Sequence, residues 1–438
     1  MNTEAIQNAV AEAAKRCGAE HYELIISSTE SAGAEALKDE ISSVSYSLAG
    51  SMRVRCVRDG RSGYATSELM TPEAAAAIVE QACDSAGVID EVDEVPLFAG
   101  SEHYADVHDE VPELMSTDEM KAHTLELQRK TMAASDKVVE GTQCFTSGLR
   151  LRQTMLSSEG LNLSYACGLN YHGVAAAVKD GEDAADEYRL ADVTRESTDE
   201  SVEKAVTGAL SRLGADSVAS GKYDLIMDCD TVRSLLSTYA SVFSARSAYL
   251  KTTLLAGREG EAVASECLTL VDDPFYPEKF GHCPFDGEGV AVCTKNVIEK
   301  GVLKTLLYNR MYAKLMGRET TGNAADAKSI EPKGLYVAAG DLSKEDLRRK
   351  LGNGLYITSL NGLHAGANIQ SGDFSLQAEG FLVENGEKTR PVKNITVADN
   401  FFQLLKKVAA LSDKVEFSLT SDIGAPEILF TDVSVSGK

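Results

Sequence analysis

The side chains with which this chain could bind a metal ion are its histidines and cysteines. A protein zinc site needs several of them at a short, fixed spacing. No two cysteines form a CxxC pair, and only His103 and His108 lie three to five residues apart, in an acidic segment where no helix is predicted. The spacing of these residues therefore predicts no zinc site in this chain. The full set is His21, His103, His108, His123, His172, His282 and His364, with cysteines at positions 17, 56, 83, 144, 167, 229, 267, 283 and 293.

A cysteine is also one example of a side chain that could act as a nucleophile. Their odd number and lack of clustering are typical of reduced, buried thiols in the cytosol. His282 and Cys283 are adjacent in sequence, but neighbouring side chains point apart. We therefore predict a structural role for the pair, with a catalytic cysteine as the alternative.

Several carboxylates stand in patterns that suit chemistry. Asp286 and Glu288 flank Gly287, an arrangement that fits either acid/base catalysis or a solvated turn, and we favour the turn. Asp272-Asp273-Pro274 could hold a hard cation, although a turn before proline needs none. No phosphate-binding GxxxxGK[ST] motif and no GxSxG serine motif occurs.

A polar cluster around residue 364 is the candidate substrate-binding site. His364 lies between glycines, and Asn368, Gln370 and Ser371 follow it. A polar, glycine-flanked loop of this kind could bind a peptide backbone. The alternative is an exposed loop with no ligand.

The charge of the chain limits the classes of partner that it can bind. It has 438 residues, 67 acidic and 43 basic side chains, and a formal net charge of −24. Such a chain is repelled by the phosphate backbone, so we expect no direct nucleic-acid binding. The N-terminus lacks a basic region followed by an apolar run, and no apolar run is long enough to span a membrane. We expect a cytoplasmic protein without membrane contact.

The spacing of apolar residues predicts helices and antiparallel strands in the first half. Thr71 and Pro72 mark one helix start, and Asp59-Gly60 marks a turn between strands. Residues 88–115, which contain Pro96 and Pro112, read as a surface connection. The predicted helices cover 3–17, 71–86, 117–135 and 198–213, and the strands cover 22–28, 41–48, 51–57, 64–67 and parts of 138–178.

The second half restarts the pattern after Gly221. We predict a strand at 223–227, a helix at 232–243, hairpins at 297–307 and 381–392, and a helix at 401–411. Asn385-Gly386 favours a two-residue hairpin turn. The expected fold is α+β in two domains: residues 1–218 with helices on an antiparallel sheet, and residues 219–438 as a β-rich barrel or curved sheet.

Five runs in the second half resemble the TldD/PmbA family when taken in order. They are Cys283–Val290, similar to the family's PFDxEG turn, Glu299–Leu303, Leu315–Ala324, Leu360–Ser375, and Glu379–Val392, similar to GFWVENGE…PV. Each is weak alone, but their order and spacing are specific. A looser resemblance over Val54–Ala65 extends it to the whole chain.

This family has two branches, and the chain resembles the one without metal ligands. The other branch looks like a zinc peptidase with a His-Glu-x-x-x-His helix and a later cysteine. By analogy that helix falls near 235–243, where this chain has Ser237, Thr238 and Val242. The chain has no cysteine after Cys293, and Tyr104 follows His103 where the motif needs glutamate. The resemblance implies no catalytic residue here.

The resemblance implies the non-catalytic subunit of a TldD/TldE-type heterodimeric zinc metallopeptidase that processes or degrades flexible peptides. Zinc is expected in the metal-bearing sister subunit, and no cofactor in this chain. A peptide would bind by edge pairing in a cleft that both subunits share. Without the sister, we expect a homodimer through the C-terminal domain. Two alternatives remain, an autonomous hydrolase with an unrecognised nucleophile and a regulator of DNA gyrase.

Overall fold

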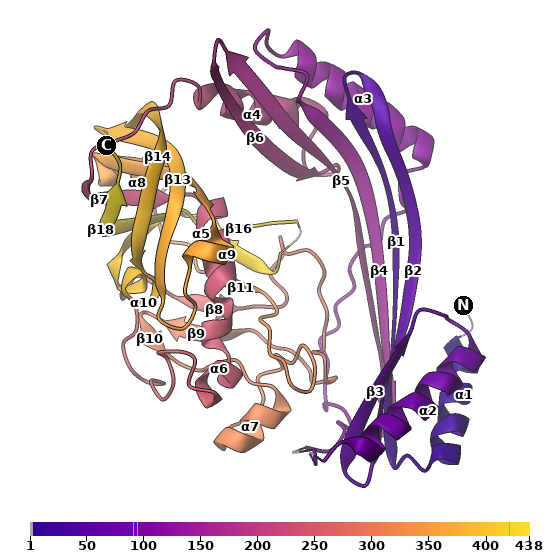
Figure 1. Cartoon of the computed structure of the whole chain (residues 1–438). Helices are drawn as coiled ribbons and strands as arrows, with labels where there is room; N and C mark the ends of the chain where they lie inside the picture. Colours follow the sequence, from indigo (N-terminus) through magenta and orange to yellow (C-terminus); the bar gives the residue numbers. More distant parts are fainter. Residues whose placement is uncertain (1–2, 91, 94, 420) are drawn as a thin grey trace.

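The first half of the chain forms a long, curved antiparallel sheet. The structure is a computed structural model that describes residues 3–90, 92–93, 95–419 and 421–438. The strands run in the order β3-β2-β1-β4-β5-β6, and Figure 1 shows them bending around the second half. Their bounds are β1 His21–Leu37, β2 Glu40–Arg58, β3 Arg61–Ser67, β4 Gln143–Ser157, β5 Asn162–Asp180 and β6 Asp183–Asp192.

Four helices cover the two ends of this sheet on its convex side (Figure 1). At one end α1 and α2 bury Ile6, Val10 and Val79 against strand residues such as Met52. At the other end α3 and α4 bury Leu127 and other apolar side chains against β4 and β5. The bounds are α1 Thr3–Cys17, α2 Pro72–Val88, α3 Thr117–Ala133 and α4 Thr198–Ser211.

The second half contains a closed ring of five strands. The order β14-β13-β12-β7-β18 is closed by a further pairing of β14 with β18, and β15 extends it from β18. The pairing of β7 with β12 is parallel, and the other pairings in the ring are antiparallel. Closure leaves the five strands without free edges that could pair with another chain. The bounds are β7 Gly221–Met227, β12 Gly354–Asn361, β13 Asp373–Glu384, β14 Glu387–Asn400, β15 Val408–Leu411 and β18 Ile428–Ser436.

A third sheet and several short helices complete the second half. The sheet has the order β10-β9-β8-β11-β17-β16. Its strands are β8 Leu270–Asp272, β9 Lys295–Glu299, β10 Val302–Leu303, β11 Leu335–Val337, β16 Glu416–Phe417 and β17 Ile423–Ala425. The helices are α5 Cys229–Tyr239, α6 Ala245–Tyr249, α7 Arg310–Met316, α8 Lys344–Leu351, α9 Leu363–Gly366 and α10 Phe401–Leu404, with 3-10 turns η1 Ala240–Phe243 and η2 Leu405–Lys407.

The predicted fold class is confirmed, and most predicted elements are present. Thr71 caps α2 by accepting a hydrogen bond from the Ala74 amide at 3.2 Å, with Pro72 in the first turn. Asn385 and Gly386 form the β13–β14 turn with φ of 54° and 84°, as the two-residue turn requires. No helix of the described residues is long and apolar enough to cross a membrane.

Several predicted boundaries were wrong. The strand at 22–28 continues to Leu37, and the two strands at 41–48 and 51–57 are the single strand β2, because its backbone stays paired with β1 through Gly50. The helix predicted at 401–411 ends by Lys407. Residues Val408–Leu411 instead pair with β18 as β15, since burial in the sheet outweighs their local helix preference.

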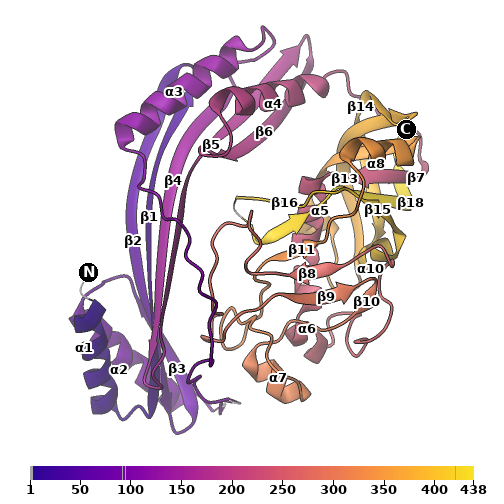
Figure 2. The ribbon, with the colours of Figure 1, turned by 180° about the vertical axis from the view of Figure 1, so that it is seen from behind.

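The segment between α2 and α3 ties the two halves together, and Figure 2 shows it passing between the sheet and the C-terminal loops. Its described residues from 95 to 115 form no helix or strand before α3. Tyr104 donates its hydroxyl to the Gly289 carbonyl at 2.7 Å, and Asp109 accepts the His282 amide at 2.7 Å. The predicted surface connection is therefore also a structural bridge.

Candidate functional site

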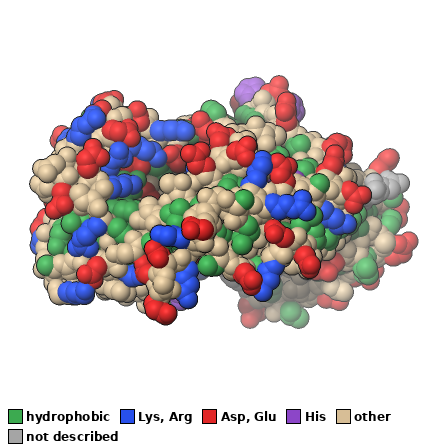
Figure 3. Space-filling view, turned by 90° about the horizontal axis from the view of Figure 1, so that it is seen from above, with side chains coloured by type: hydrophobic (Ala, Val, Ile, Leu, Met, Phe, Trp, Pro, Cys, Tyr) green, Lys and Arg blue, Asp and Glu red, His purple; other side chains and the backbone are tan. Residues whose placement is uncertain are grey.

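A cleft separates the concave face of the N-terminal sheet from the C-terminal domain. It contains a series of cavities of about 1010, 480 and 540 Å³. The first two share Tyr171 and Leu419, and the first and third share Glu187, Arg212 and Thr358. The largest cavity therefore adjoins each of the other two. Seen from above, acidic and basic side chains are interspersed over the visible surface (Figure 3).

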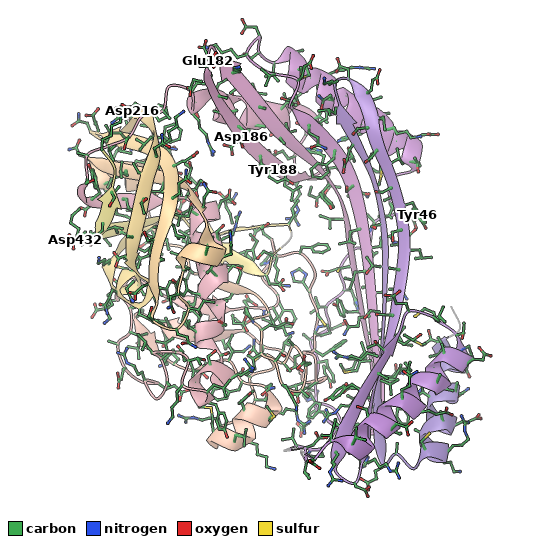
Figure 4. All side chains as sticks on the ribbon, viewed as in Figure 1. Tyr46, Glu182, Asp186, Tyr188, Asp216 and Asp432 are labelled. Atoms are coloured by element: carbon green, nitrogen blue, oxygen red, sulfur yellow. The ribbon has the colours of Figure 1, made fainter. Side chains whose placement is uncertain are left out.

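Two unpaired strand edges line the largest cavity. β6 is the last strand of the N-terminal sheet and β16 is the last strand of the third sheet. Residues of both strands line this cavity, and Figure 4 places Asp186 and Tyr188 of β6 beside it. An exposed strand edge offers main-chain donors and acceptors to an extended peptide.

Aromatic side chains form part of the cavity wall next to β6. The Phe145 ring stacks on the Tyr188 ring with centroids 6.5 Å apart and meets the Tyr171 ring edge-on at 6.1 Å. All three residues line the largest cavity. Aromatic faces of this kind suit apolar side chains of a bound peptide.

Cys167 and Cys283, which line the cavity of about 480 Å³, are not activated as nucleophiles. Burial raises the pKa of the Cys283 thiol to about 12 and that of the Cys167 thiol to about 11. The His282 ring contacts Asp109 Oδ1 at 2.5 Å and the Tyr276 carbonyl at 2.9 Å, while Cys283 Sγ donates to the Phe285 carbonyl at 3.1 Å. A thiolate nucleophile needs a lowered pKa and a nearby base, so the structural reading of the pair fits this geometry.

The turn at Asp286-Gly287-Glu288 is buried, and its interpretation as a solvated turn was wrong. Asp286 is 2% exposed and Glu288 is 4% exposed. Asp286 accepts backbone N–H bonds from Glu288, Val290 and Ala324 at 2.9, 3.0 and 2.9 Å. The turn is buried because it packs where the C-terminal domain meets the N-terminal sheet, with Phe285 in one apolar cluster with Ile25 and Met155.

Glu288 has the more unusual environment of the two carboxylates. Its Oε2 accepts the Arg310 amide at 2.9 Å, whereas its buried Oε1 has no hydrogen-bond partner in the described structure. Burial raises its pKa to about 7. A carboxyl group with this pKa is able to exchange a proton near neutral pH, but it does not line any of the three cavities described above.

Asp272 is a structural residue rather than a cation ligand. Its side chain is fully buried and accepts hydrogen bonds from the Lys333 and Gly334 amides at 2.8 and 2.9 Å and from Asn323 at 2.7 Å. Lys295 supplies the counter-charge at 3.0 Å. These donors occupy both carboxylate oxygens.

The region compared with the metal helix does not assemble a zinc site. Ser237 lies exposed on α5, and Thr238 donates its hydroxyl to the Ser234 carbonyl at 2.9 Å. Val242 follows the end of α5 on η1 and is fully buried in the core. Among the described residues, no group of three or more His, Cys, Asp or Glu side chains could hold a metal ion. Hydroxyl and hydrocarbon groups here do not fit zinc.

The predicted peptide-binding loop lies around α9. His364, Asn368 and Gln370 are exposed, and Ser371 is half-buried. Asn368 Oδ1 accepts the Gln370 and Ser371 amides at 3.0 and 3.1 Å, and Ser371 donates to Asp373 at 2.8 Å. Two of the four side chains thus shape their own turn. None of the four lines the three cavities of the cleft, and their role in binding stays a prediction.

Sequence reasoning missed a polar cluster at the rim of the strand ring. Tyr356 donates its hydroxyl to Glu427 at 2.7 Å, and Lys344 contacts Glu427 at 3.2 Å and Glu416 at 2.8 Å. Lys388 Nζ lies 3.5 Å from the centroid of the Tyr356 ring. These residues come from β12, β14, α8, β16 and the residue before β18, which only the tertiary structure brings together. The one local signal was the Asn-Gly turn, which places Lys388 two residues past a hairpin tip.

Family models that are described as metallopeptidase domains match both the curved sheet and the strand ring. The PmbA/TldA metallopeptidase C-terminal domain matches residues 220–437, and PmbA/TldA metallopeptidase domain 1 matches residues 22–86. The chain belongs to the PmbA/TldD family. The C-terminal match begins next to the domain boundary predicted at residue 219.

Relatives of the chain carry the same family name. It is 30% identical to the metalloprotease PmbA homolog of Haemophilus influenzae over 54% of this chain, which spans only half (50%) of that relative. It is 24% identical to metalloprotease PmbA of Escherichia coli O157:H7 over 95% of this chain and 92% of the relative.

Solved structures share the fold over the whole chain. A proposed modulator of DNA gyrase from Thermotoga maritima has a TM-score of 0.89 and 25% identity, covering 99% of this chain and 100% of that one. TldE from Thermococcus kodakarensis has a TM-score of 0.87 and 23% identity, covering 99% and 100%.

Proposed function

We propose that this chain is the non-catalytic subunit of a two-subunit peptidase of the TldD/TldE type. The proposal rests on the residue types in α5 and η1. Ser237, Thr238 and the buried Val242 in this segment offer no donor set for zinc. Its relatives are described as metalloproteases. A metal-bearing sister subunit would then supply the zinc-bound water that attacks the peptide bond.

The cleft is the part of this chain that would contact the substrate. The β6 and β16 edges lie on one cavity of about 1010 Å³, and an extended peptide could pair with a strand edge through its main chain. Main-chain pairing accepts many sequences but requires an unfolded segment. The proposed substrate is therefore a flexible peptide rather than a folded protein.

Metal content gives the first test. Elemental analysis of the chain after mild purification should find no stoichiometric zinc. The residues at the position that corresponds to the metal helix are not zinc ligands. The sister subunit, analysed in parallel, serves as the positive control. About one zinc per chain that resists exchange would contradict the proposal.

Reconstitution tests the activity itself. The chain alone should leave flexible peptides intact, and addition of the sister should produce cleavage that a zinc chelator abolishes. Cleavage by the lone chain that survives the chelator but stops with a thiol reagent would favour the alternative of an autonomous cysteine hydrolase. The raised pKa of Cys283 and Cys167 speaks against that outcome.

Edge pairing can be tested by changing the peptide instead of the protein. A peptide N-methylated at alternate residues loses the N–H groups on one edge while its side chains stay the same. Two such peptides, methylated in opposite registers, should differ in affinity for the isolated chain, because only one strand edge faces the protein. Equal affinity of both for the chain would argue against strand pairing.

A second candidate function is regulation of DNA gyrase, since the Thermotoga maritima relative is described as a gyrase modulator. The net charge of −24 disfavours contact with DNA but allows contact with the enzyme. Co-purification from the native cell distinguishes the two functions. A metal-bearing sister in the eluate supports the peptidase subunit, and gyrase subunits without it support the regulator.

A further inference from the structure

The cavity between α4 and the strand ring is positively charged in a strongly acidic chain. It measures about 540 Å³ and is lined from the N-terminal side by β6 and α4, and from the C-terminal side by β12, β13 and β14. Its charged lining residues are the bases Lys204, Arg212, Lys388 and Arg390 and the acids Glu187 and Asp228. The whole chain carries −24, so this local excess of positive charge needs an explanation.

Three of the four basic side chains already have partners. Lys204 contacts Glu196 at 2.6 Å, and Arg212 contacts Glu187 at 2.5 Å. Arg390 donates to the Ser217 carbonyl at 3.1 Å and to the Asp216 carbonyl at 3.4 Å.

Lys388 differs from these neighbours. Its Nζ lies 3.5 Å from the Tyr356 ring centroid and 5.1 Å from that of Phe381. Across the part of the chain that the structure describes, Lys388 forms no ion pair, and Glu416 and Glu427 pair with Lys344 instead. The two aromatic faces hold the ammonium group at the cavity wall, where it stays free to bind an anion.

A hydroxyl group without a partner lies in the same cavity wall. Thr358 stands at a β-bulge between Ile357 and Ser359, where β12 loses register with β13. Its Oγ1 is buried and makes no hydrogen bond in the described structure. Bulges of this kind turn a side chain out of the regular ladder and are frequent beside functional sites. A buried hydroxyl lacking a partner is costly unless a ligand supplies one.

Asp228 limits the charge that this cavity can accept. It caps α5 by accepting the Thr231 amide at 2.8 Å, so the positive end of the helix is already neutralised by the chain's own carboxylate. Glu427, the other carboxylate near Lys388, is paired with Lys344 at 3.2 Å. The ammonium of Lys388 beside Asp228 therefore favours a singly charged, planar anion over a phosphate dianion.

We propose that this cavity binds one carboxylate group, the C-terminal carboxylate of a peptide in the cleft, with Lys388 as counter-ion and the Thr358 hydroxyl as hydrogen-bond donor. The cavity shares Glu187, Lys204, Arg212 and Thr358 with the large cavity along β6. A peptide paired with β6 would reach it with one end. The choice of a peptide rests on the proposed function, whereas the carboxylate site does not.

Binding of matched peptides to the isolated chain tests the proposal. A flexible peptide labelled at its N-terminus is prepared with a free C-terminal carboxylate and as its C-terminal amide, and fluorescence anisotropy measures both affinities. We expect the acid to bind about tenfold more tightly than the amide. Lys388→Met keeps the apolar stem and should lower affinity for the acid to that for the amide. Lys222→Met removes an exposed lysine paired with Asp432 at 3.4 Å. This control variant should change neither the affinity for the acid nor the affinity for the amide.

Equal affinity of acid and amide for the unaltered chain would overturn the carboxylate site and leave the peptide cleft standing. Absence of binding by either peptide would instead count against the proposed function. A second measurement keeps the carboxylate site testable in that case. Acetate should slow the acylation of Lys388 by a trace amine reagent, and acetamide at the same concentration should not. Equal rates of Lys388 acylation in acetate and in acetamide would overturn the proposal. Stronger protection of Lys388 by inorganic phosphate than by acetate would also overturn it.

Discussion

At the scale of single residues, the junction between the two halves is held by buried carboxylates with different roles. Asp286 receives three backbone N–H bonds, whereas one oxygen of Glu288 has no partner in the described structure. Both lie within the electrostatic reach of Arg310, and Glu23 and Arg55 of the N-terminal sheet contribute to the same field. The junction is therefore a place where protonation affects stability.

Glu288 should make the protein less stable as pH rises. Its pKa is raised from 4.5 to about 7 in the folded chain, so the folded state holds the proton more tightly than the unfolded state. The stabilisation is complete below pH 4.5 and is lost as pH rises through about 7. Glu288→Gln, a neutral isostere, should raise the thermal midpoint at pH 8 by about 2–4 °C and flatten its dependence on pH over this window.

Asp286→Asn provides the matched control for that experiment. One amide oxygen cannot replace two carboxylate oxygens that accept three N–H bonds, so this variant should lower the thermal midpoint. Thermal melts from pH 4 to pH 8 measure both. A Glu288→Gln variant that is less stable at pH 8 than the unaltered chain would show that the ionised form is the stabilising one.

At the scale of elements, α2 approaches β3 so closely that only glycine fits between them. A Cβ on Gly63 would lie 1.9 Å from the Ala82 carbonyl oxygen and 2.4 Å from the Ala86 nitrogen. Both contacts are with backbone, which cannot rotate away. The run of small residues in α2 and the glycine in β3 therefore act together to seat the helix on the sheet.

Gly63→Ala should separate α2 from the sheet and destabilise the N-terminal domain by more than ~2 kcal/mol. Gly87→Ala, in the same helix but with nothing within 4 Å of the added methyl, should stabilise it by up to ~1 kcal/mol. Denaturant unfolding followed by far-UV circular dichroism measures both. Similar effects of the two substitutions would mean that the close approach does not hold this helix in place.

At the scale of the whole molecule, exposed apolar residues mark surfaces that a partner could cover. In the C-terminal domain, Tyr249, Leu250, Leu254 and Leu315 on and around α6 and α7 are 47, 48, 54 and 36% exposed. In the N-terminal sheet, Tyr46 and Leu48 lie on the part of β2 that β3 does not cover and are 64 and 71% exposed. Figure 4 shows Tyr46 at the outer side of the sheet. Exposed apolar groups of this kind are typical of interaction sites.

We expect a homodimer through the C-terminal domain when the sister subunit is absent, burying more than ~1,000 Å². The charge of −24 per chain opposes association weakly, because the Debye length at physiological salt is only ~8 Å. Leu254→Glu should shift the mass measured by light scattering towards the monomer, and Leu48→Glu on β2 should not. A monomer at micromolar concentration, or dissociation by Leu48→Glu alone, would place the pairing surface elsewhere.

The sequence by itself determined the elements with strong local signals. Thr71 and Pro72 mark the start of α2, and Asn385 and Gly386 form the turn between β13 and β14. The apolar stripe of α1, with Ile6 and Val10, faces the core. The family followed from ordered motifs, and the α+β class from the spacing of strands and helices. These features depend on a few consecutive residues, whose backbone preferences act within one turn.

Only the tertiary structure decided what lies between those elements. Val408–Leu411 became a strand because β18 was there to pair with it, and Asp286 and Glu288 became buried because a distant sheet covers them. Lys388, Tyr356 and Thr358 meet at one cavity through the pairing of β12, β13 and β14 and a bulge in β12. Burial and long-range pairing depend on residues far apart in the chain, and no local pattern contains them.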